Sequence, residues 1–314
     1  MASSLDIVIV NWNTGQQLRD CLYSICGAAN DGLRVERIIV VDNASSDGSA
    51  DGLDDLPLPV TVIRNSWNAG FAAASNQGAT GSREDYLLFL NPDTRLFEAS
   101  LVVPVSFMEE PGNERVGTCG IQLVDDQGNV ARTCARFPTP TMIILSMLGL
   151  DVLLARWCPG HIMTEWDHGS NRDVDRVIGA FLLVRRKVFE AFGGFDERFF
   201  LYFEDVDFSL RMREKAWRSV YLCGAQAFHK GAGSSAQAKT KRVLHVLRSR
   251  ILYSYKHFGY LAGTFVLLGT LLLEPVPRLV WHIAHRSGSE FKATLKAYVM
   301  LCIDIPEILK RARS

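Results

Sequence analysis

The hydrophobic pattern of the first ninety residues alternates between short apolar runs and longer mixed segments. Four runs rich in Val, Ile and Leu lie at residues 6–12, 37–43, 60–65 and 86–91. Continuous apolar runs of this length are typical of parallel strands that are buried on both faces. The segments at residues 16–28 and 69–79 have the length of helices. Strand and helix alternating at this spacing predict an α/β fold with a doubly wound, mostly parallel sheet.

Polar residues follow every predicted strand. In doubly wound sheets, ligands bind in the crevice outside the carboxyl ends of the strands. The side chains of interest are therefore those just after each apolar run: Asn11, Asn13, Asp42, Asn43, Asn65, Asn68, Asn91 and Asp93. The first strand is followed by neither G-x-G-x-x-G nor G-x-x-x-x-G-K, so the pattern indicates neither a dinucleotide-binding fold nor a P-loop.

Composition and charge divide the chain into a body and a tail. A chain of 314 residues that is 48% hydrophobic can bury a full core, as one large domain or one domain with an appendage. The net charge is zero, yet residues 239–314 hold 13 of the 34 Lys and Arg and only 4 of the 34 Asp and Glu. This asymmetry suggests a body that handles a metal and a tail that meets an anionic surface. We expect a main domain over residues 1–238 and a basic, apolar helical region over residues 239–314.

The cysteines and the N-terminus bear on the compartment. Seven cysteines lie between Cys21 and Cys302 without a C-x-x-C spacing, which predicts neither a disulfide framework nor a zinc cluster. The N-terminus lacks a basic stretch followed by an apolar run and a cleavage site, so we expect no secretory signal. A reducing, cytoplasmic location fits these features best.

Six motifs resemble those of family-2 glycosyltransferases in order and spacing, and bacterial rhamnosyltransferases of cell-surface polysaccharide synthesis most of all. They lie within about residues 5–235, at residues 7–13, 38–49, 68–78, 88–94, 179–217 and 228–235. The resemblance implies a GT-A fold with a C-terminal helical appendage, a nucleotide-sugar donor, a divalent metal and inversion at the anomeric carbon.

The expected donor site begins with Asp42, at the predicted switch point of the sheet. Its carboxylate is suited to accept a hydrogen bond from the ring N–H of uracil or thymine, although a cap on the following helix is the alternative. Asn68 and Gly70 are expected to shape a loop that turns backbone N–H groups toward the nucleotide, with Asn76 in support. Simple turn chemistry explains these three residues equally well.

Asp93 is the candidate metal ligand. Mg²⁺ or Mn²⁺ on a diphosphate is typically held by one or two carboxylates together with the phosphates, so one acid fixed after Pro92 suffices. The family often carries Asp-x-Asp at this point, whereas this chain carries Asn91-Pro92-Asp93. His229 resembles the histidine that completes the metal site in many relatives, and a structural role is its alternative.

Three acids, Glu204, Asp205 and Asp207, crowd a predicted helix N-terminus, where the helix dipole tolerates anions. Inverting transfer needs a carboxylate that takes the proton of the acceptor hydroxyl. The family places this base in the Glu-Asp pair, which implies Asp205 as the base and Glu204 as the residue that orients the acceptor. Asp207 reads better as a helix cap. Upstream, Gly193 and Gly194 are expected to allow close approach of the backbone to sugar.

Two further apolar stretches lie at residues 141–157 and 260–277. The first interrupts the α/β pattern and is expected to face the acceptor or the membrane. The second is shorter than the ~20 apolar residues that a spanning helix needs, so a helix in the plane of the membrane is the better interpretation. Its basic flanks suit anionic headgroups, namely Arg248, Arg250, Lys256, Arg278 and Arg286. A buried helical hairpin or a homodimer contact is the alternative.

The leading hypothesis is an inverting, metal-dependent glycosyltransferase that uses a dTDP- or UDP-sugar, with L-rhamnose from dTDP-rhamnose as a candidate. The acceptor would be a glycan or a polyprenyl-linked molecule, and the enzyme would lie peripherally at the inner face of the bacterial plasma membrane. No nucleic acid is expected as a partner. Two other classes remain open, a nucleotidyltransferase and a non-catalytic glycan-binding module.

Overall fold

The computed structural model describes residues 3–28, 33–53, 56–151, 156–157, 159–231 and 239–313. The chain divides into two compact units. Unit 1 comprises Met1–Ala135, Ile162–Glu197 and Asp205–Ser234, and unit 2 comprises Arg136–His161, Arg198–Glu204 and Ser235–Ser314. The boundary predicted after residue 238 falls at the edge of residues 232–238, which lie outside the described residues.

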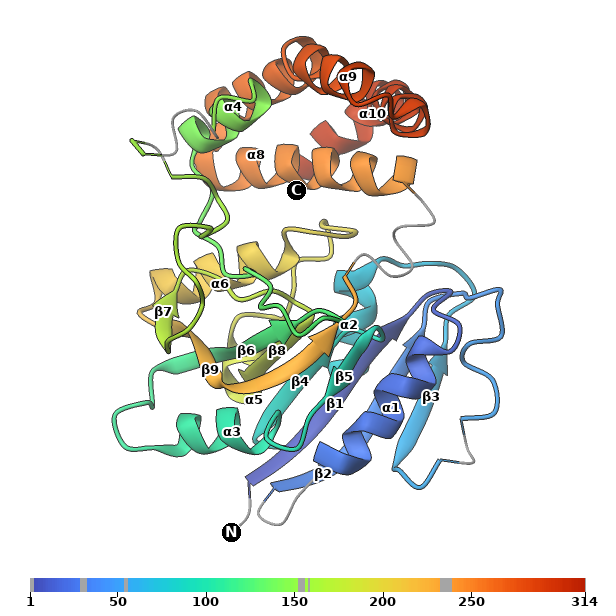
Figure 1. Ribbon diagram of the computed structural model, residues 1–314, viewed down its shortest axis with the longest axis vertical. Helices are drawn as coiled ribbons and strands as arrows, with labels where there is room; N and C mark the ends of the chain where they lie inside the picture. The colour runs from blue at the N-terminus through green and yellow to red at the C-terminus, as the bar shows by residue number, and fades with distance from the viewer. Residues whose placement is uncertain are drawn as a thin grey trace. The chain divides into compact units, whose positions relative to one another are not determined.

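Unit 1 is built on one sheet. Within the described residues, nine strands pair in the order β3-β2-β1-β4-β8-β6-β9-β5, and β7 pairs with β9 (Figure 1). Six strands, β1 to β4, β6 and β9, run in one direction, and the other three run against them. The bounds are β1 Ser3–Asn11, β2 Leu33–Asp42, β3 Val60–Arg64, β4 Tyr86–Leu90, β5 Thr94–Leu96, β6 Val116–Val124, β7 Arg172–Val174, β8 Phe181–Arg185 and β9 Arg218–His229.

Helices cover both faces of this sheet, because the strands are apolar on both sides. On one face, Leu5, Ile7 and Ile9 of β1 pack with α1 (Gln17–Ala28) and α3 (Val102–Glu109). On the other, Val8 packs with α2, α5 and α6, whose bounds are Phe71–Ala79, Arg186–Ala191 and Glu204–Glu214. The predicted doubly wound, mostly parallel sheet is confirmed, and the four predicted strands correspond to β1 to β4.

Unit 2 is helical. Its helices are α4 (Pro140–Met147), α8 (Lys239–Leu272), α9 (Pro275–Ala284) and α10 (Gly288–Arg313). Helix α8 breaks at Gly259, whose φ of 81° favours glycine, and the chain then folds back so that a Cβ at Gly263 would lie 2.6 Å from the Tyr255 ring. Ile143 and Met147 of α4 pack on Val266. The predicted apolar segment 260–277 therefore comprises the return arm of a hairpin, residues 260–272 of α8, and the start of α9.

Three of the five basic residues expected to meet headgroups form ion pairs within unit 2: Arg248 with Asp304, and Arg250 and Arg278 with Glu274. Arg250 is buried, donates to Thr270 Oγ1 at 2.8 Å and forms an ion pair with Glu274, which is also buried. Arg278 pairs with the same carboxylate. Because an unpaired charge in this position would be strongly unfavourable, Arg250, Arg278 and Glu274 are expected to act together as an internal brace. For Arg250 the expectation of an exposed, headgroup-facing side chain was wrong.

Candidate active site

The ends of β1 and β2 meet through Asn11 and Asp42, which are neighbours in the parallel register. Asn11 Nδ2 donates to Asp42 Oδ1 at 2.9 Å and to the hydroxyls of Ser45 and Ser49 at 3.1 and 2.8 Å. Both Asn11 and Asp42 are buried. The other carboxylate oxygen of Asp42 lies 3.9 Å from the Arg64 guanidinium. Oδ1 of Asp42 is thus held by Asn11, whereas Oδ2 lies on the side of Arg64.

The loops after β1 and β2 are tied to each other. Asn13, in the left-handed region at φ 51°, accepts from Ser46 N at 2.8 Å and donates its own backbone N–H to Ser45 Oγ at 3.0 Å. Asp47 accepts from Gly15 N at 2.9 Å and Ser49 N at 3.0 Å. Partial burial of Asp47 acts the other way, but these hydrogen bonds outweigh it and lower the pKa of its carboxyl. The loops form one polar, anchored rim beside Asp42.

Asn43 organises the next loop. Its side chain is buried, with Nδ2 donating to Asn68 Oδ1 at 2.9 Å and to Gly70 O at 3.1 Å, and with Oδ1 accepting from Asn65 Nδ2 at 3.1 Å. Asn68 Oδ1 also accepts from Gly70 N at 3.0 Å. Gly70 precedes α2 at a φ of 91°, which requires glycine. Asn43 was a candidate from the sequence, but its role as the hydrogen-bonding centre of this turn was not predicted.

Asn76 does not join this cluster. It exchanges two hydrogen bonds with the backbone of Phe195, at 2.8 and 2.9 Å, and contacts Glu197 at 3.0 Å. A Cβ at Gly194, where φ is 72°, would lie 2.6 Å from Asn76 Oδ1. Gly194 thus permits the close approach of Asn76, and the expected approach of Gly193 and Gly194 to sugar stays a prediction.

Asp93 and His229 are brought together by the sheet. The chain turns at Asn91-Pro92-Asp93, with Thr94 N donating to Asn91 O at 3.1 Å, and enters β5, where Thr94 lies opposite His229 of β9. Asp93 Oδ1 lies 3.3 Å from His229 Nε2. Asp93 is 9% exposed, and His229 Nε2 is buried without a hydrogen-bond partner. The turn after β4 thus places the carboxylate of Asp93 next to the imidazole at the end of β9.

This pair suits a divalent cation on a diphosphate. Oxygen and imidazole nitrogen are both ligands for Mn²⁺, and Mg²⁺ is usually bound through few protein ligands together with phosphate oxygens. Within the described ranges, the chain has no group of three or more His, Cys, Asp or Glu placed to hold a metal by itself. The residues present fit a metal that arrives with the nucleotide.

Asp205 is paired with an arginine that the sequence analysis missed. Its Oδ2 accepts from Arg176 Nε and Nη2 at 2.9 and 2.7 Å and from Gly179 N at 3.2 Å, while Oδ1 accepts from Val206 N at 2.8 Å. Asp205 is 4% exposed. Arg176 belongs to no recognisable sequence motif, and only its contact with Asp205 in the structure reveals it.

The residues around Asp205 reach the end of β4. Gly179 N contacts Asp205, and the next carbonyl, Ala180 O, accepts from Asn91 N at 3.0 Å. Two consecutive residues therefore join the carboxylate of Asp205 to the turn that carries Asp93. A candidate base and a candidate metal ligand are placed on one connected part of unit 1.

The start of α6 carries the other acids. Tyr202 and Phe203 both have positive φ, 67° and 70°, directly before Glu204, which is buried. Aromatic residues rarely adopt this conformation, and such strain concentrates at functional sites. Asp207 is fully buried and its Oδ2 accepts from Arg211 Nε at 2.8 Å, one turn further along α6. Arg211 in turn donates to the Phe192 and Gly194 carbonyls, so Asp207 acts in packing.

The mixed α/β fold, with its mostly parallel sheet, is that of a GT-A glycosyltransferase. The chain belongs to that class through its family: the model of "Glycosyl transferase family 2" matches residues 6–193, so this is a member of glycosyl transferase family 2. The resemblance seen in the sequence is confirmed.

Individual relatives agree with this assignment. The chain is 27% identical to an N-acetylglucosaminyl-diphospho-decaprenol L-rhamnosyltransferase of Mycobacterium tuberculosis, over 83% of this chain and 87% of the relative. It is 30% identical to rhamnosyltransferase WbbL of Escherichia coli, over 46% of this chain and 52% of the relative. The mannosyltransferase PcManGT of Pyrobaculum calidifontis, solved with GDP-Man and Mn²⁺, has a similar fold with a TM-score of 0.52 at 14% identity, covering 98% of this chain and 85% of the other.

Proposed function

We propose that this family 2 glycosyltransferase transfers L-rhamnose from dTDP-rhamnose to a hydroxyl of a glycan or polyprenyl-linked acceptor, with inversion at the anomeric carbon. The observation that carries the proposal is the connection of Asp205 through Gly179 and Ala180 to the turn that bears Asp93. The names of the M. tuberculosis and E. coli relatives support rhamnose as the sugar.

The proposed donor site lies at the carboxyl ends of β1, β2 and β4. Asp42 Oδ2 accepts from the ring N–H of the base, because Oδ1 is already held by Asn11. The loops around it contact the nucleotide and the diphosphate, and they contribute Asn11, Asn13, Asn43, Asn68, Gly70, Asn91 and Asp93. Asn76 supports the site indirectly, by holding the segment around Phe195.

Asp93 and His229 are proposed to hold Mg²⁺ or Mn²⁺. The ion would neutralise charge on the diphosphate as it leaves. The buried Nε2 of His229 and the adjacent Asp93 oxygen support this role. The presence of Mn²⁺ beside GDP-Man in the structurally similar mannosyltransferase is consistent with it.

Asp205 is the proposed general base, and Glu204 is proposed to orient the acceptor. The acceptor oxygen attacks the anomeric carbon, its proton passes to the carboxylate, and the bond from that carbon to the diphosphate oxygen breaks. Oδ2 accepts from Arg176 and Gly179, whereas Oδ1 accepts from the backbone N–H of Val206, so Oδ1 is the oxygen proposed to take the proton. Arg176 acts by positioning this carboxylate.

A donor assay tests the proposal. The protein is incubated with dTDP-rhamnose, Mn²⁺ and a polyprenyl-diphosphate glycan, and free dTDP and glycosylated product are measured. Release of dTDP that depends on metal and acceptor is expected. Release of pyrophosphate from dTTP and a sugar phosphate would instead indicate a nucleotidyltransferase, and donor binding without turnover would indicate a glycan-binding module. UDP-sugars in parallel test the nucleotide.

We also propose that residues 239–314 attach the enzyme peripherally to the inner face of the bacterial plasma membrane. The excess of basic residues in this segment supports the proposal. A homodimer formed through the same region is the second candidate, since unpartnered apolar helices also suit a subunit contact.

A further inference from the structure

Helix α9 turns its apolar side chains outward and its polar side chains inward. Val276, Val280 and Ile283 are each more than half exposed, and no residue of α9 is buried. On the opposite side, Arg278 contacts Glu274, and His282 Nε2 lies 3.1 Å from Thr294 Oγ1 of α10. A surface helix of a soluble protein has the reverse arrangement. This helix is therefore built to face something apolar.

The return arm of α8 has the same character. Leu261, Phe265, Leu268 and Leu272 recur at spacings of four, three and four residues, which places them on one stripe of the helix. All four are exposed, Leu261 to 73%. The other side of this arm is buried, and no residue from Phe258 to Leu273 carries a charge.

Helix α10 adds basic residues to an exposed apolar stripe. Leu295, Val299 and Ile303 are spaced by four residues and are exposed, Ile303 to 72%. Lys292 and Lys296, also exposed, share this side of the helix. Lysine side chains in such a position can lay their methylene stems along an apolar phase and keep the ammonium at its boundary.

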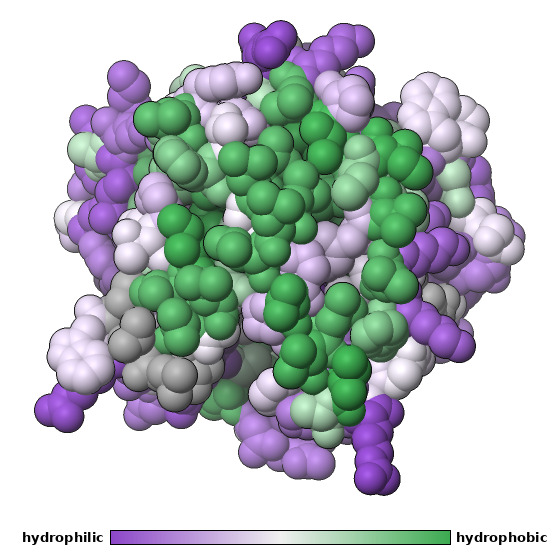
Figure 2. Space-filling model, turned by 90° about the horizontal axis from the view of Figure 1, so that it is seen from above, coloured by the Kyte–Doolittle hydropathy of each residue, from purple (hydrophilic) through white to green (hydrophobic). Residues whose placement is uncertain are grey.

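We call the exposed stripes of α8, α9 and α10 together the outer face of unit 2; Ile144 and Leu148 of α4 are exposed in the same unit. Figure 2 shows this face as a broad hydrophobic area with hydrophilic residues around its margin. Soluble monomers rarely expose contiguous apolar patches beyond a few hundred Å², and larger ones mark sites of association.

The surplus of basic residues in unit 2 distinguishes between a second copy and an anionic bilayer as the partner of the outer face. Each of the four acids in residues 239–313 is paired with a base: Glu274 with Arg250 and Arg278, Glu290 with Lys239, Asp304 with Arg248, and Glu307 with Arg311. The remaining charges of this region are positive. A two-fold contact between copies would set this positive surplus against itself, whereas an anionic bilayer complements it.

The length of the apolar arm of α8 bears on whether it can span a bilayer. The segment Lys239–Ala284 is apolar and long enough to pass as a candidate span by composition. The chain breaks at Gly259 and again before Pro275, however, so the straight apolar arm from Tyr260 to Leu272 is about 20 Å long. The hydrocarbon core is about 30 Å thick.

We propose that the outer face of unit 2 docks on an anionic lipid bilayer, with α9, the return arm of α8 and the exposed stripe of α10 lying in the plane of the headgroups. This deepens the peripheral attachment proposed above by naming the residues that enter the lipid. Val280 and Ile283 insert, Lys292 and Lys296 contact the headgroups, and Arg250 and Arg278 brace Glu274 from within.

The test uses the full chain and sedimentation with phosphatidylcholine vesicles, with and without phosphatidylglycerol. The double variant Val280→Glu/Ile283→Glu is expected to reduce binding to anionic vesicles about 100-fold, because two carboxylates would enter the apolar layer. The variant Lys292→Gln/Lys296→Gln is expected to reduce it about 5-fold per lysine on anionic vesicles and not on neutral ones. Phe265→Ser provides a second, uncharged variant of the same face.

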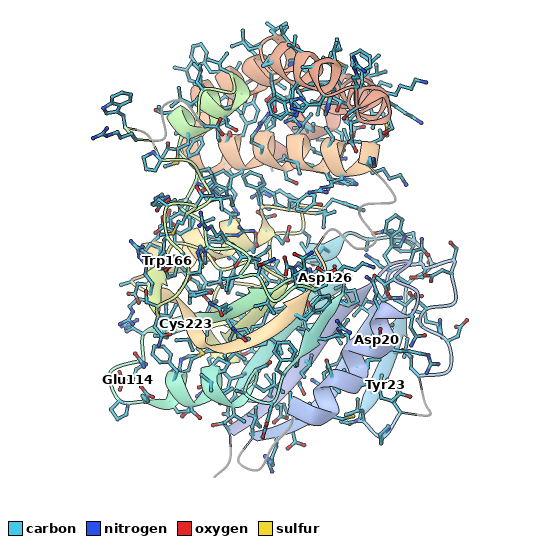
Figure 3. The ribbon with its side chains drawn as sticks, in the orientation of Figure 1. Asp20, Tyr23, Glu114, Asp126, Trp166 and Cys223 are labelled. Carbon is cyan, nitrogen blue, oxygen red and sulfur yellow. The ribbon has the colours of Figure 1, made fainter. Side chains whose placement is uncertain are left out.

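The matched control places the same number of carboxylates on exposed apolar residues of unit 1, as Tyr23→Glu/Val130→Glu; Tyr23 is labelled on α1 in Figure 3. It is expected to bind vesicles like the wild type. All variants should keep the circular dichroism spectrum and the affinity for dTDP-rhamnose with Mn²⁺. If the wild type does not bind the donor but does bind vesicles, the proposed function fails and the docking proposal stands.

Three outcomes would overturn the docking proposal. The first is a double glutamate variant that sediments with vesicles as well as the wild type does. The second is a wild-type dimer, seen by analytical ultracentrifugation, that this variant dissociates while neither protein binds vesicles; a second copy would then cover the face. The third is wild-type protein in cell membranes that resists extraction by alkaline carbonate, which would indicate a spanning helix.

Discussion

The two units of this protein differ in which side chains they bury and which they expose. Unit 1 buries the apolar residues of its strands under helices on both faces and carries polar residues such as Asn11 and Asp42 at the strand ends. Unit 2 buries Arg250 and Glu274 and leaves Leu261, Val280 and Ile303 exposed. The first arrangement suits a water-soluble ligand, and the second suits an apolar boundary. One chain thus combines polar strand ends in unit 1 with an exposed apolar face in unit 2, and predictions can be made separately for each.

The largest effect is expected at the proposed base in unit 1. Asp205→Asn keeps the shape of the side chain and most contacts to Arg176 and Gly179, but the amide cannot take a proton. Turnover should fall by about 10²- to 10⁴-fold, as is typical for a lost general base, with donor affinity nearly unchanged. Single-turnover transfer and a separate donor-binding measurement check this.

Asp207→Asn is the control for Asp205→Asn. Its carboxylate pairs with Arg211, which holds two backbone carbonyls, so this variant should lower the melting temperature while the folded fraction keeps most of its transfer rate. A near wild-type rate for Asp205→Asn, together with a loss for Glu204→Gln or Asp207→Asn, would show that the base is a different carboxylate. If none of the three changes transfer, the proposed chemistry itself fails.

Strand and helix positions in unit 1 were predictable, because apolar runs bounded by turn residues define them. The run at residues 86–91 corresponds to β4, and residues 16–28 correspond to α1. The antiparallel strand β8 and the short strands β5 and β7 were not predicted. Their place depends on pairing with partners far along the chain, such as Phe181 with Leu90, and local pattern carries no information about such pairing.

The site was predictable where a residue follows a strand, as for Asn11, Asp42 and Asp93, because parallel strands end at one edge of the sheet. It was not predictable where contacts come from elsewhere. Arg176 reaches Asp205 from 29 residues away, and Asn76 reaches Phe195 from 119 residues away. The roles of these residues in catalysis and donor binding stay predictions.

The next largest effect is expected in unit 2, from its buried ion pair. Glu274→Gln leaves the Arg250 guanidinium buried without a counter-charge, and breaking such a pair should lower the free energy of unfolding by about 3 kcal/mol. Glu290→Gln, which removes an exposed pair with Lys239, should change it by less than about 1 kcal/mol. Urea unfolding followed by circular dichroism measures both. Equal small losses would mean that the brace contributes little to the helical unit.

A third effect separates metal binding from folding in unit 1. Asp93→Ala removes one of the two proposed ligands, and the affinity for dTDP in the presence of Mn²⁺ should fall about 100-fold, while the melting temperature of the protein without ligand changes little. Calorimetric titration with dTDP, with and without Mn²⁺, measures it. Asp20→Ala, at an exposed acid of α1 labelled in Figure 3, should leave this affinity unchanged. If Asp20→Ala lowers the affinity for dTDP with Mn²⁺ as much as Asp93→Ala does, Asp93 is not assigned as a metal ligand.

The smallest effect is a pH dependence that should belong to unit 2. Burial first, and then the nearby Arg248 and Lys241, lower the pKa of His245 to about 4, where its ring stacks on Phe200 at 4.6 Å between centroids. In the unfolded chain the pKa is near 6.5, so the unfolded state binds the proton first as the pH falls. The stabilising contribution of neutral His245 is complete above pH 6.5 and is lost between about pH 6.5 and pH 4. This loss should be about 2 kcal/mol between pH 7 and pH 5.

His245→Gln should flatten the pH dependence of the free energy of unfolding in this interval, and His285→Gln, at an exposed position on the same unit, should not. An unchanged slope in the His245 variant would show that another group titrates in this range.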